Sequence, residues 1–268
     1  MDRLRFFSMG SGSSGNCYYV GTGEYGILID AGVGVRAIKK ELKTKGIGLE
    51  QIWGIFITHD HTDHIKSVGS LGEKSHIPVY LTREMHAGID RNYHVAEKLN
   101  SCCRHYTKGD VVTIKDMTIQ SFAVSHDATD CVGYTICYGD QCMVLATDLG
   151  YISKEVADQI KRANYLVIEA NYDETMLKNG PYPYPLKERV RAHTGHLSND
   201  HTANFLADNY HEGLSHIFLC HLSKENNTPD IAYNTVNEAL QSKGITVELL
   251  KPLARTEPSE MYVFRSLK

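Results

Sequence analysis

Short apolar runs alternate along this chain with segments in which apolar positions recur at helical spacing. The apolar runs predict strands at 3–9, 17–21, 25–30, 52–58, 78–81, 117–125, 131–138, 142–147, 165–169, 215–220, 245–249 and 260–265. The other segments predict helices at 35–45, 63–73, 83–98, 153–162, 186–191, 199–210 and 229–242, the last with Thr228 as N-cap and Pro229 at its first position. This order predicts an α/β (α+β) fold in which two mixed sheets pack face to face with helices outside.

Four side chains that can bind metal follow the apolar run 52–57: His59, His61, Asp63 and His64. Alternate residues of a strand face the same side, so His59 and His61 can contact one ion together. Asp63 and His64 lie beyond the strand end and suit a second ion, about 3.5–4 Å from the first in two-metal hydrolases. Nitrogen and oxygen ligands suit Zn²⁺, with Mn²⁺ or Fe as alternatives, so we expect two divalent ions.

This HxHxDH run resembles the signature of the metallo-β-lactamase fold superfamily, and the likeness extends along the full chain. The resemblance implies a four-layer αββα sandwich with the metal ligands along one open edge. It further implies that His126 completes the first metal site, that Asp148 bridges both ions and that His221 completes the second site. Asp30, by the same resemblance, orients the metal loop without binding metal. Each of these residues ends an apolar run, and strand ends on one edge of a sheet converge on one cleft.

Two positions separate branches within this superfamily. The bridging position holds Asp148, where true zinc β-lactamases typically have cysteine. Position 61 is histidine, where the oxygen-reducing diiron branch usually has glutamate, so redox chemistry is disfavoured. Four further segments, 10–16, 169–173, 195–199 and 221–229, resemble the YycJ/WalJ-type branch of bacterial metal-dependent five-prime-to-three-prime DNA exonucleases. The resemblance therefore implies phosphodiester hydrolysis by a metal-bridging hydroxide, with DNA (or RNA) as the partner.

The remaining candidate residues concern the phosphate. His196 lies just before a predicted helix with Ser198 as its N-cap, and a helix N-terminus favours an anion. We expect His196 to assist the leaving group or hold the phosphate, as a catalytic residue beside Asp63 and Asp148; its alternative is a structural histidine bound to a carbonyl. Ser14 and Asn16, in the loop after the first strand, are predicted with Ser198 to contact the substrate.

Composition constrains the function only weakly. The net charge is −4 and the pI is about 6.4, which is not the basic footprint of a tight nucleic-acid binder. Two bound ions would nevertheless add positive charge inside the cleft, so a nuclease is not excluded. Basic residues cluster in two places, which we interpret as solvated helix faces: Lys187, Arg189 and Arg191, and Lys39, Lys40, Lys43 and Lys45.

The cysteines and the apolar runs predict where the protein works. Seven cysteines without a CxxC pair indicate reduced, mostly buried thiols, with Cys137 and Cys142 flanking a hairpin turn at Gly139-Asp140. No run has the length of a membrane span, and the first residues do not form a signal peptide. We expect a cytoplasmic protein of unspecified oligomeric state with no membrane partner. We also expect a single hydrolase domain over 1–268, without the longer β-CASP insertion of RNA-processing relatives.

Three alternatives remain open. The first is a phosphodiesterase for small cyclic or phosphonate-derived diesters. The second is a thioester hydrolase of the glyoxalase II kind, which the apparent lack of a C-terminal helical domain disfavours. The third is a metal-binding scaffold without activity, which the complete ligand set disfavours.

Overall fold

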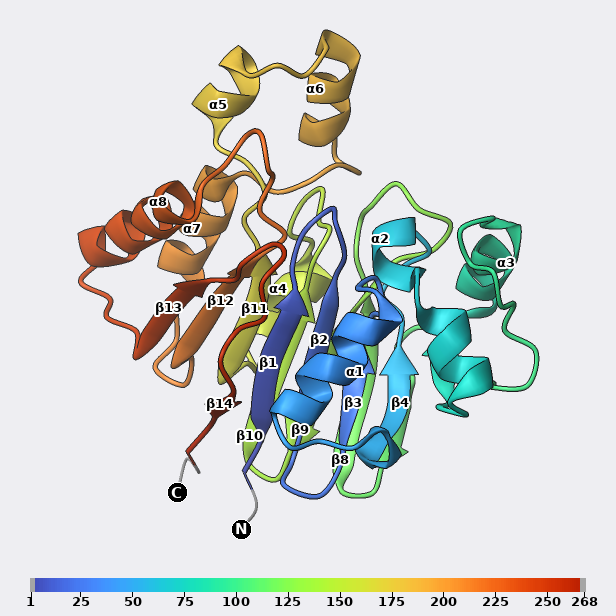
Figure 1. Cartoon of the computed structure of the whole chain (residues 1–268). Helices are drawn as coiled ribbons and strands as arrows, with labels where there is room; N and C mark the ends of the chain where they lie inside the picture. The colour runs from blue at the N-terminus through green and yellow to red at the C-terminus, as the bar shows by residue number, and fades with distance from the viewer. Residues whose placement is uncertain (1–2, 266–268) are drawn as a thin grey trace.

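The computed structural model describes residues 3–265, so residues 1–2 and 266–268 of the predicted domain lie outside the described range. Two seven-stranded sheets pack face to face with helices on both outer faces, as predicted (Figure 1). The first sheet has the strand order β14-β1-β2-β3-β4-β5-β6 and the second has the order β13-β12-β11-β10-β9-β8-β7. Each sheet mixes antiparallel and parallel pairs, for example β1 with β2 and β3 with β4.

The strands of the first sheet are β1 (Arg5–Gly10), β2 (Cys17–Gly21), β3 (Gly26–Ile29), β4 (Ile52–Phe56), β5 (Val79–Leu81), β6 (Cys103–His105) and β14 (Tyr262–Val263). Those of the second are β7 (Val111–Ile114), β8 (Met117–Ala123), β9 (Val132–Tyr138), β10 (Gln141–Ala146), β11 (Tyr165–Glu169), β12 (His216–Cys220) and β13 (Leu249–Pro252). The α-helices are α1 (Val35–Thr44), α2 (Thr62–Ile65), α3 (Arg83–Arg91), α4 (Lys154–Ile160), α5 (Glu174–Asn179), α6 (Tyr184–Arg191), α7 (Asn199–Asn209) and α8 (Pro229–Ser242). A short 3-10 helix (Leu49–Gln51) and a π-helical turn (Ser70–Lys74) complete the set.

Successive side chains of the central strands point to opposite faces of the sheet, so their apolar side chains are divided between two cores. On β10, Met143 and Leu145 belong to the core between the sheets, whereas Val144 and Ala146 face the helices. Alpha-helices α4, α7 and α8 cover that outer face, and α1 covers the first sheet. Burial on both faces explains why β10, β11 and β12 read as continuous apolar runs.

Several sequence predictions of secondary structure were wrong in detail. The helix predicted at 63–73 is interrupted: α2 ends at Ile65 and a π-helical turn follows at Ser70–Lys74. The helix predicted at 83–98 ends at Arg91, and the side chain of Asn92 donates to Thr62 Oγ1 at 3.1 Å instead of continuing it. The strand predicted at 245–249 lies at Leu249–Pro252. Tertiary contacts outweighed local periodicity at these places.

Three elements have no counterpart in the prediction: β6, β7 and α5. Strand β6 lies at an edge of its sheet and has the sequence Cys-Arg-His. This sequence shows no alternation of apolar and polar residues. Alpha-helix α5 begins where the side chain of Asp173 accepts a hydrogen bond from Met176 N. With α6, α5 stands above the upper edge of the sandwich (Figure 1).

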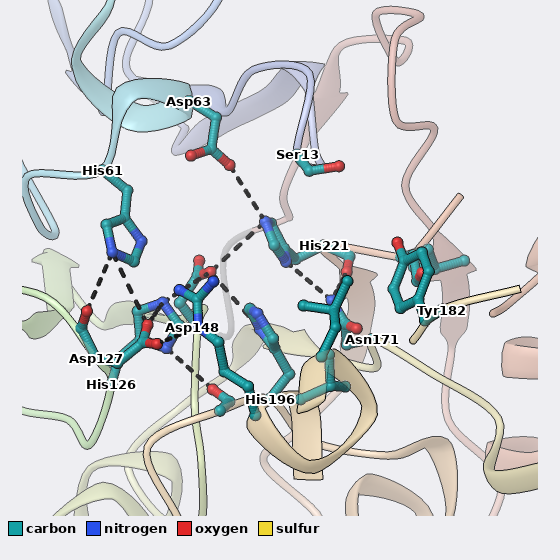
Figure 2. Close-up of a pocket in the computed structure, with 16 residues that line it drawn as sticks. Ser13, His61, Asp63, His126, Asp127, Asp148, Asn171, Tyr182, His196 and His221 are labelled. Carbon is teal, nitrogen blue, oxygen red and sulfur yellow. Dashed lines mark hydrogen bonds and ion pairs between the residues drawn. The ribbon is translucent and has the colours of Figure 1, made fainter. Parts of the chain in front are cut away.

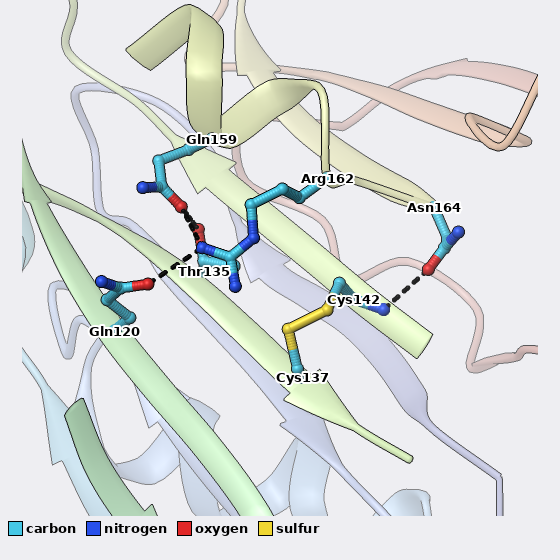
Figure 3. Close-up of a disulfide and its surroundings, with 7 residues drawn as sticks. All are labelled: Gln120, Thr135, Cys137, Cys142, Gln159, Arg162 and Asn164. Atoms are coloured by element: carbon cyan, nitrogen blue, oxygen red, sulfur yellow. Dashed lines mark hydrogen bonds between the residues drawn. A yellow bond between two sulfur atoms is a disulfide. The ribbon is translucent and has the colours of Figure 1, made fainter. Parts of the chain in front are cut away.

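The cysteine prediction was wrong for one pair. Cys137 and Cys142 are directly opposite each other on β9 and β10 and form a disulfide (Figure 3). Their sequence separation is 5 and their Cα atoms are 4.2 Å apart, so the hairpin at Gly139 brings them together. The other five cysteines are free, and all but Cys103 are buried. Among residues 3–265, no helix has the length and apolar character needed to cross a membrane.

Candidate metal centre

The predicted ligands converge at the edge of the sandwich where the strands end. His59, His61, Asp63 and His64 follow β4, while His126, Asp148 and His221 follow β8, β10 and β12. Figure 2 shows side chains from both sheets pointing into one cavity of about 250 Å³. The structure thus brings together all seven side chains that the sequence nominated for metal.

The donor atoms fall into two neighbouring groups. One ligand atom from each of His59, His61 and His126 lies within 4.8 Å of the others, and the same holds for Asp63, His64 and His221. Asp148 lies between the groups: its Oδ1 is 3.7 Å from His126 Nε2 and 3.5 Å from His221 Nε2. Its Oδ2 is 3.3 Å from His64 Nε2. This is the arrangement that a shared carboxylate between two ions requires.

Two buried nitrogen atoms test whether metal fits here. Nε2 of His59 and Nε2 of His221 are inaccessible to solvent and have no hydrogen-bond partner within residues 3–265. A buried polar atom without a partner is costly, so natural sites retain one only where something else satisfies it. A divalent cation would do so at both nitrogens, and the imidazole and carboxylate donors suit such an ion.

Contacts behind the ligands hold them in orientation. Asp30 is fully buried and accepts from Thr58 N and Thr58 Oγ1, both at 2.8 Å, and from His64 Nδ1 at 2.7 Å. It therefore fixes both the start of the metal loop and the ring of His64. His126 Nδ1 donates to the carbonyl of Gly195 at 2.9 Å, which leaves its Nε2 directed at Asp148.

Glu169 is a central contact whose role the sequence analysis did not recognise. The side chain is fully buried, and its Oε2 accepts from Leu149 N at 2.7 Å and from Leu197 N at 3.2 Å. Its Oε1 lies 2.7 Å from His196 Nδ1 and 3.2 Å from His221 Nδ1. Glu169 ends β11 just as the ligands end their strands, and that shared position was the available signal.

Charge within the cluster keeps its carboxylates ionised. Burial alone would raise the pKa of Asp63, but His64 and His221 outweigh it and lower the pKa to about 2. Burial would likewise raise the pKa of Asp148, yet His221 and His64 hold it well below its usual range. Both carboxylates are therefore available as negatively charged donors at neutral pH.

Three residues at the centre have left-handed backbone conformations: Asp30 with φ 62°, Asp148 with φ 54° and His221 with φ 53°. Such angles are uncommon for residues other than glycine and cost free energy that the surrounding structure must supply. Each residue lies within two positions of a strand end, and the turn directs Asp148 and His221 into the cavity and Asp30 onto Thr58 and His64. Sequence patterns carry no sign of this feature.

The predicted substrate residues have different surroundings. Asn16 is fully buried, with its side-chain nitrogen 2.9 Å from His64 Nε2, so it lies under the cluster away from any substrate path. Ser198 is 1% exposed and caps α7 by accepting from His201 N, which is the capping role the sequence predicted. Ser14 is exposed, but its neighbour Ser13 lines the cavity. Of these positions, the structure thus brings only the loop around Ser13 to the cleft.

His196 and the α6 segment complete the cavity wall. The ring of His196 stacks on that of His221, with centroids 5.2 Å apart. Arg189 and Tyr182 also line the cavity, and Arg189 Nε lies 2.6 Å from Asp127 Oδ2. The interpretation of Arg189 as part of a solvated helix face was therefore incomplete, because this residue borders the metal cluster.

The family assignment rests on the comparison with known sequences. A model of the beta-lactamase superfamily domain matches residues 25–217. The chain belongs to the beta-lactamase superfamily. It is 35% identical over 256 residues to the exodeoxyribonuclease YycJ of Bacillus anthracis, covering 95% of this chain and 96% of that protein. It is also 35% identical over 241 residues to the exodeoxyribonuclease WalJ of Streptococcus pneumoniae, covering 89% of each.

Solved structures of this superfamily share the fold. Zn²⁺-bound PqqB from Methylobacterium extorquens superposes with a TM-score of 0.71 at 14% identity, over 96% of this chain and 99% of that one. The fold prediction is confirmed, and so is the resemblance to the YycJ/WalJ-type branch. Taken with its named relatives, this superfamily member is a metal-dependent hydrolase.

Proposed function

We propose that this protein is a two-metal phosphodiester hydrolase that degrades DNA from the five-prime end. The observation that carries the proposal is the combination of near full-length similarity to proteins named exodeoxyribonucleases with a cluster of seven metal-competent side chains. In this proposal His59, His61 and His126 hold one ion, and Asp63, His64 and His221 hold the other. Asp148 is shared by both.

The ions, Zn²⁺ or Mn²⁺, would lower the pKa of water and offset negative charge on the phosphate. The residues around the ions would orient the attacking water. Asp63 and Asp148 are ionised and directed into the cavity, where each can accept a hydrogen bond from the attacking water. Their positions favour a single attack direction on a phosphorus atom held in the cleft.

His196 is placed to serve the leaving group. Its Nδ1 donates to Glu169 at 2.7 Å, which leaves Nε2 to face the cavity that the ring lines. From Nε2 the imidazole can donate a proton to the departing oxygen or a hydrogen bond to a phosphate. Ser13 and Arg189 both line the same cavity and can contact the phosphates of a strand entering it.

The remaining parts of the proposal concern organisation and location. We propose one hydrolase domain over 1–268 without a β-CASP insertion, because only the short α5–α6 segment and α7 separate β11 from β12. A cytoplasmic location is supported by the five free cysteines.

The deciding experiment uses protein loaded separately with Mn²⁺ and Zn²⁺. The substrate is a five-prime-phosphorylated DNA strand labelled at either end, and the products are resolved by length. We expect stepwise release of mononucleotides from the five-prime end, abolished by Asp148→Asn, which tolerates the left-handed backbone at this position. Asp158→Asn, at an exposed carboxylate of α4, is the matched control and should leave the ladder unchanged.

Two results would overturn the proposal. Full activity of the metal-loaded Asp148→Asn variant would remove Asp148 from the mechanism. Turnover of bis(p-nitrophenyl) phosphate or a glutathione thioester, without cleavage of any nucleic acid, would instead assign the protein to a small-molecule branch of the superfamily.

A further inference from the structure

A second group of metal-competent side chains lies outside the catalytic cluster. It consists of His86 on α3 and Cys103 and His105 on the edge strand β6. Cys103 and His105 are two residues apart on the strand and therefore face the same side, toward α3. One ligand atom from each of the three lies within 4.8 Å of the others.

One ion can bind only one nitrogen of His86. Nε2 of His86 lies 2.9 Å from the carbonyl of Leu99, so Nε2 carries the proton and Nδ1 has the free lone pair. His86 Nδ1 lies 3.0 Å from His105 Nε2, while ligand atoms around a tetrahedral zinc ion, with bonds of about 2.0–2.3 Å, are separated by roughly 3.3–3.8 Å. Cys103 Sγ, 3.6 Å from the other nitrogen of the same ring, is the third donor of the group.

Hydrogen bonding fixes the ring of His86. Its Nε2 donates to the carbonyl of Leu99 at 2.9 Å, and Asp90 Oδ2, one helical turn further along α3, lies 3.8 Å from the same nitrogen. Both contacts are at the nitrogen that does not face His105, so they orient the ring.

We propose that His86, Cys103 and His105 form a three-ligand zinc site distinct from the proposed catalytic pair. The thiolate sets its preference, because sulfur with imidazole favours Zn²⁺ over the harder Mn²⁺. The proposed catalytic ligands include no cysteine, so the two sites differ in chemistry as well as in place.

The position of the site indicates what the ion would do. It joins α3 to β6, an edge strand whose outer backbone groups need protection. The opposite side of α3 supports the metal loop: Gly88 packs so closely against Asp60 that a Cβ there would collide with its carboxylate, and Asn92 donates to Thr62 Oγ1 at 3.1 Å. A zinc ion at this place would fix α3 and, through it, the segment that carries the catalytic histidines.

Cobalt substitution distinguishes this site from the catalytic pair. Metal-free full-length protein is titrated with Co²⁺, and thiolate-to-cobalt charge transfer is recorded in the near-ultraviolet. We expect this band in the parent protein and expect Cys103→Ser to abolish it. Zinc content by mass spectrometry should fall by one ion per chain in the same variant. Cys102→Ser, at the adjacent buried cysteine, is the matched control and should keep both signals.

Two further variants make the outcome decisive. His86→Ala should weaken the band without changing any thiol, whereas Asp148→Asn should leave it intact even if catalysis fails, which separates this proposal from the proposed function. Circular dichroism confirms that each variant is folded. The proposal is overturned if the parent shows no charge-transfer band, or if the band survives Cys103→Ser, since Cys220 beside His221 would then be its source.

Discussion

Exchanging Glu169 for glutamine would remove one charge from beneath the metal cluster while preserving shape. The carboxylate is ionised in the folded protein, because His196 outweighs the effect of burial and lowers the pKa of Glu169. In Glu169→Gln the amide oxygen can still accept from Leu149 N and Leu197 N, the two contacts of Oε2. The amide nitrogen must then replace Oε1 and present N–H groups to the Nδ1 atoms of His196 and His221.

Two donors would thus oppose each other at 2.7 Å and 3.2 Å. A hydrogen bond to a charged partner contributes about 1.5–3 kcal/mol, and one such contact to each histidine is lost or weakened. Loss of a group that orients a metal-binding histidine typically costs about 10–100-fold in affinity or activity, equivalent to about 1.4–2.7 kcal/mol. We therefore expect metal affinity at the Asp63, His64 and His221 group to fall by about 10–100-fold.

The assay combines metal competition with kinetics. A chelating fluorophore measures the affinity of each ion, and exonuclease assays with saturating metal measure kcat and KM. Only the ion held by Asp63, His64 and His221 should be affected, and kcat should stay low even at saturation because His196 also loses its acceptor. Glu225→Gln is the matched control, because this exposed glutamate pairs only with Lys224 among the ion pairs of residues 3–265. Unchanged affinity and kcat in Glu169→Gln would refute the role of Glu169.

Three further predictions address other parts of the molecule. In metal-free protein, charge on the buried His64 ring should stabilise the fold below pH 6.5, and this stabilisation should be lost as pH rises through the raised pKa of about 9. Urea unfolding across this range should show a decrease of about 3 kcal/mol from His64, to which the raised pKa of His221 adds, and bound metal should remove the dependence. Arg189→Ala should raise KM for DNA and reduce the salt dependence of binding by about one phosphate contact, with kcat nearly unchanged, as steady-state kinetics at several salt concentrations will show. Replacing Cys137 and Cys142 together with serine should lower the free energy of unfolding by no more than about 2 kcal/mol, because the closed loop is short; a larger loss in urea unfolding without reductant would contradict this account.

Most strands could be predicted because burial on both faces leaves a continuous apolar run in the sequence. The exceptions are β6 and α5, which are rich in polar residues, and the short, largely exposed edge strand β7. Strand β6 is held by pairing with β5, and α5 depends on the cap at Asp173. The end of α3 at Arg91 depends on contacts of Asn92 with a loop some thirty positions earlier in the chain. Local periodicity contains no information about such long-range contacts.

Within the candidate site, sequence was sufficient to nominate the metal-competent residues. His126, Asp148 and His221 each end an apolar run. The spacing within residues 59–64 groups the other four metal-competent side chains into two pairs, His59 with His61 and Asp63 with His64. It was insufficient for the residues that orient them. Glu169 and Asn16 carry ordinary polar side chains, and only their burial against His196 or His64 distinguishes them from surface positions.

The amino-acid sequence by itself determined the type of fold and the inventory of donors, because hydrophobic periodicity and ligand chemistry are local properties of the chain. Tertiary structure alone decided how closely these donors approach one another. Asp148 lies between the two groups only because β10 occupies the centre of its sheet and the left-handed turn after it aims the carboxylate across the cleft. Strand order and side-chain direction arise from pairings between distant segments, whose energies depend on the whole fold.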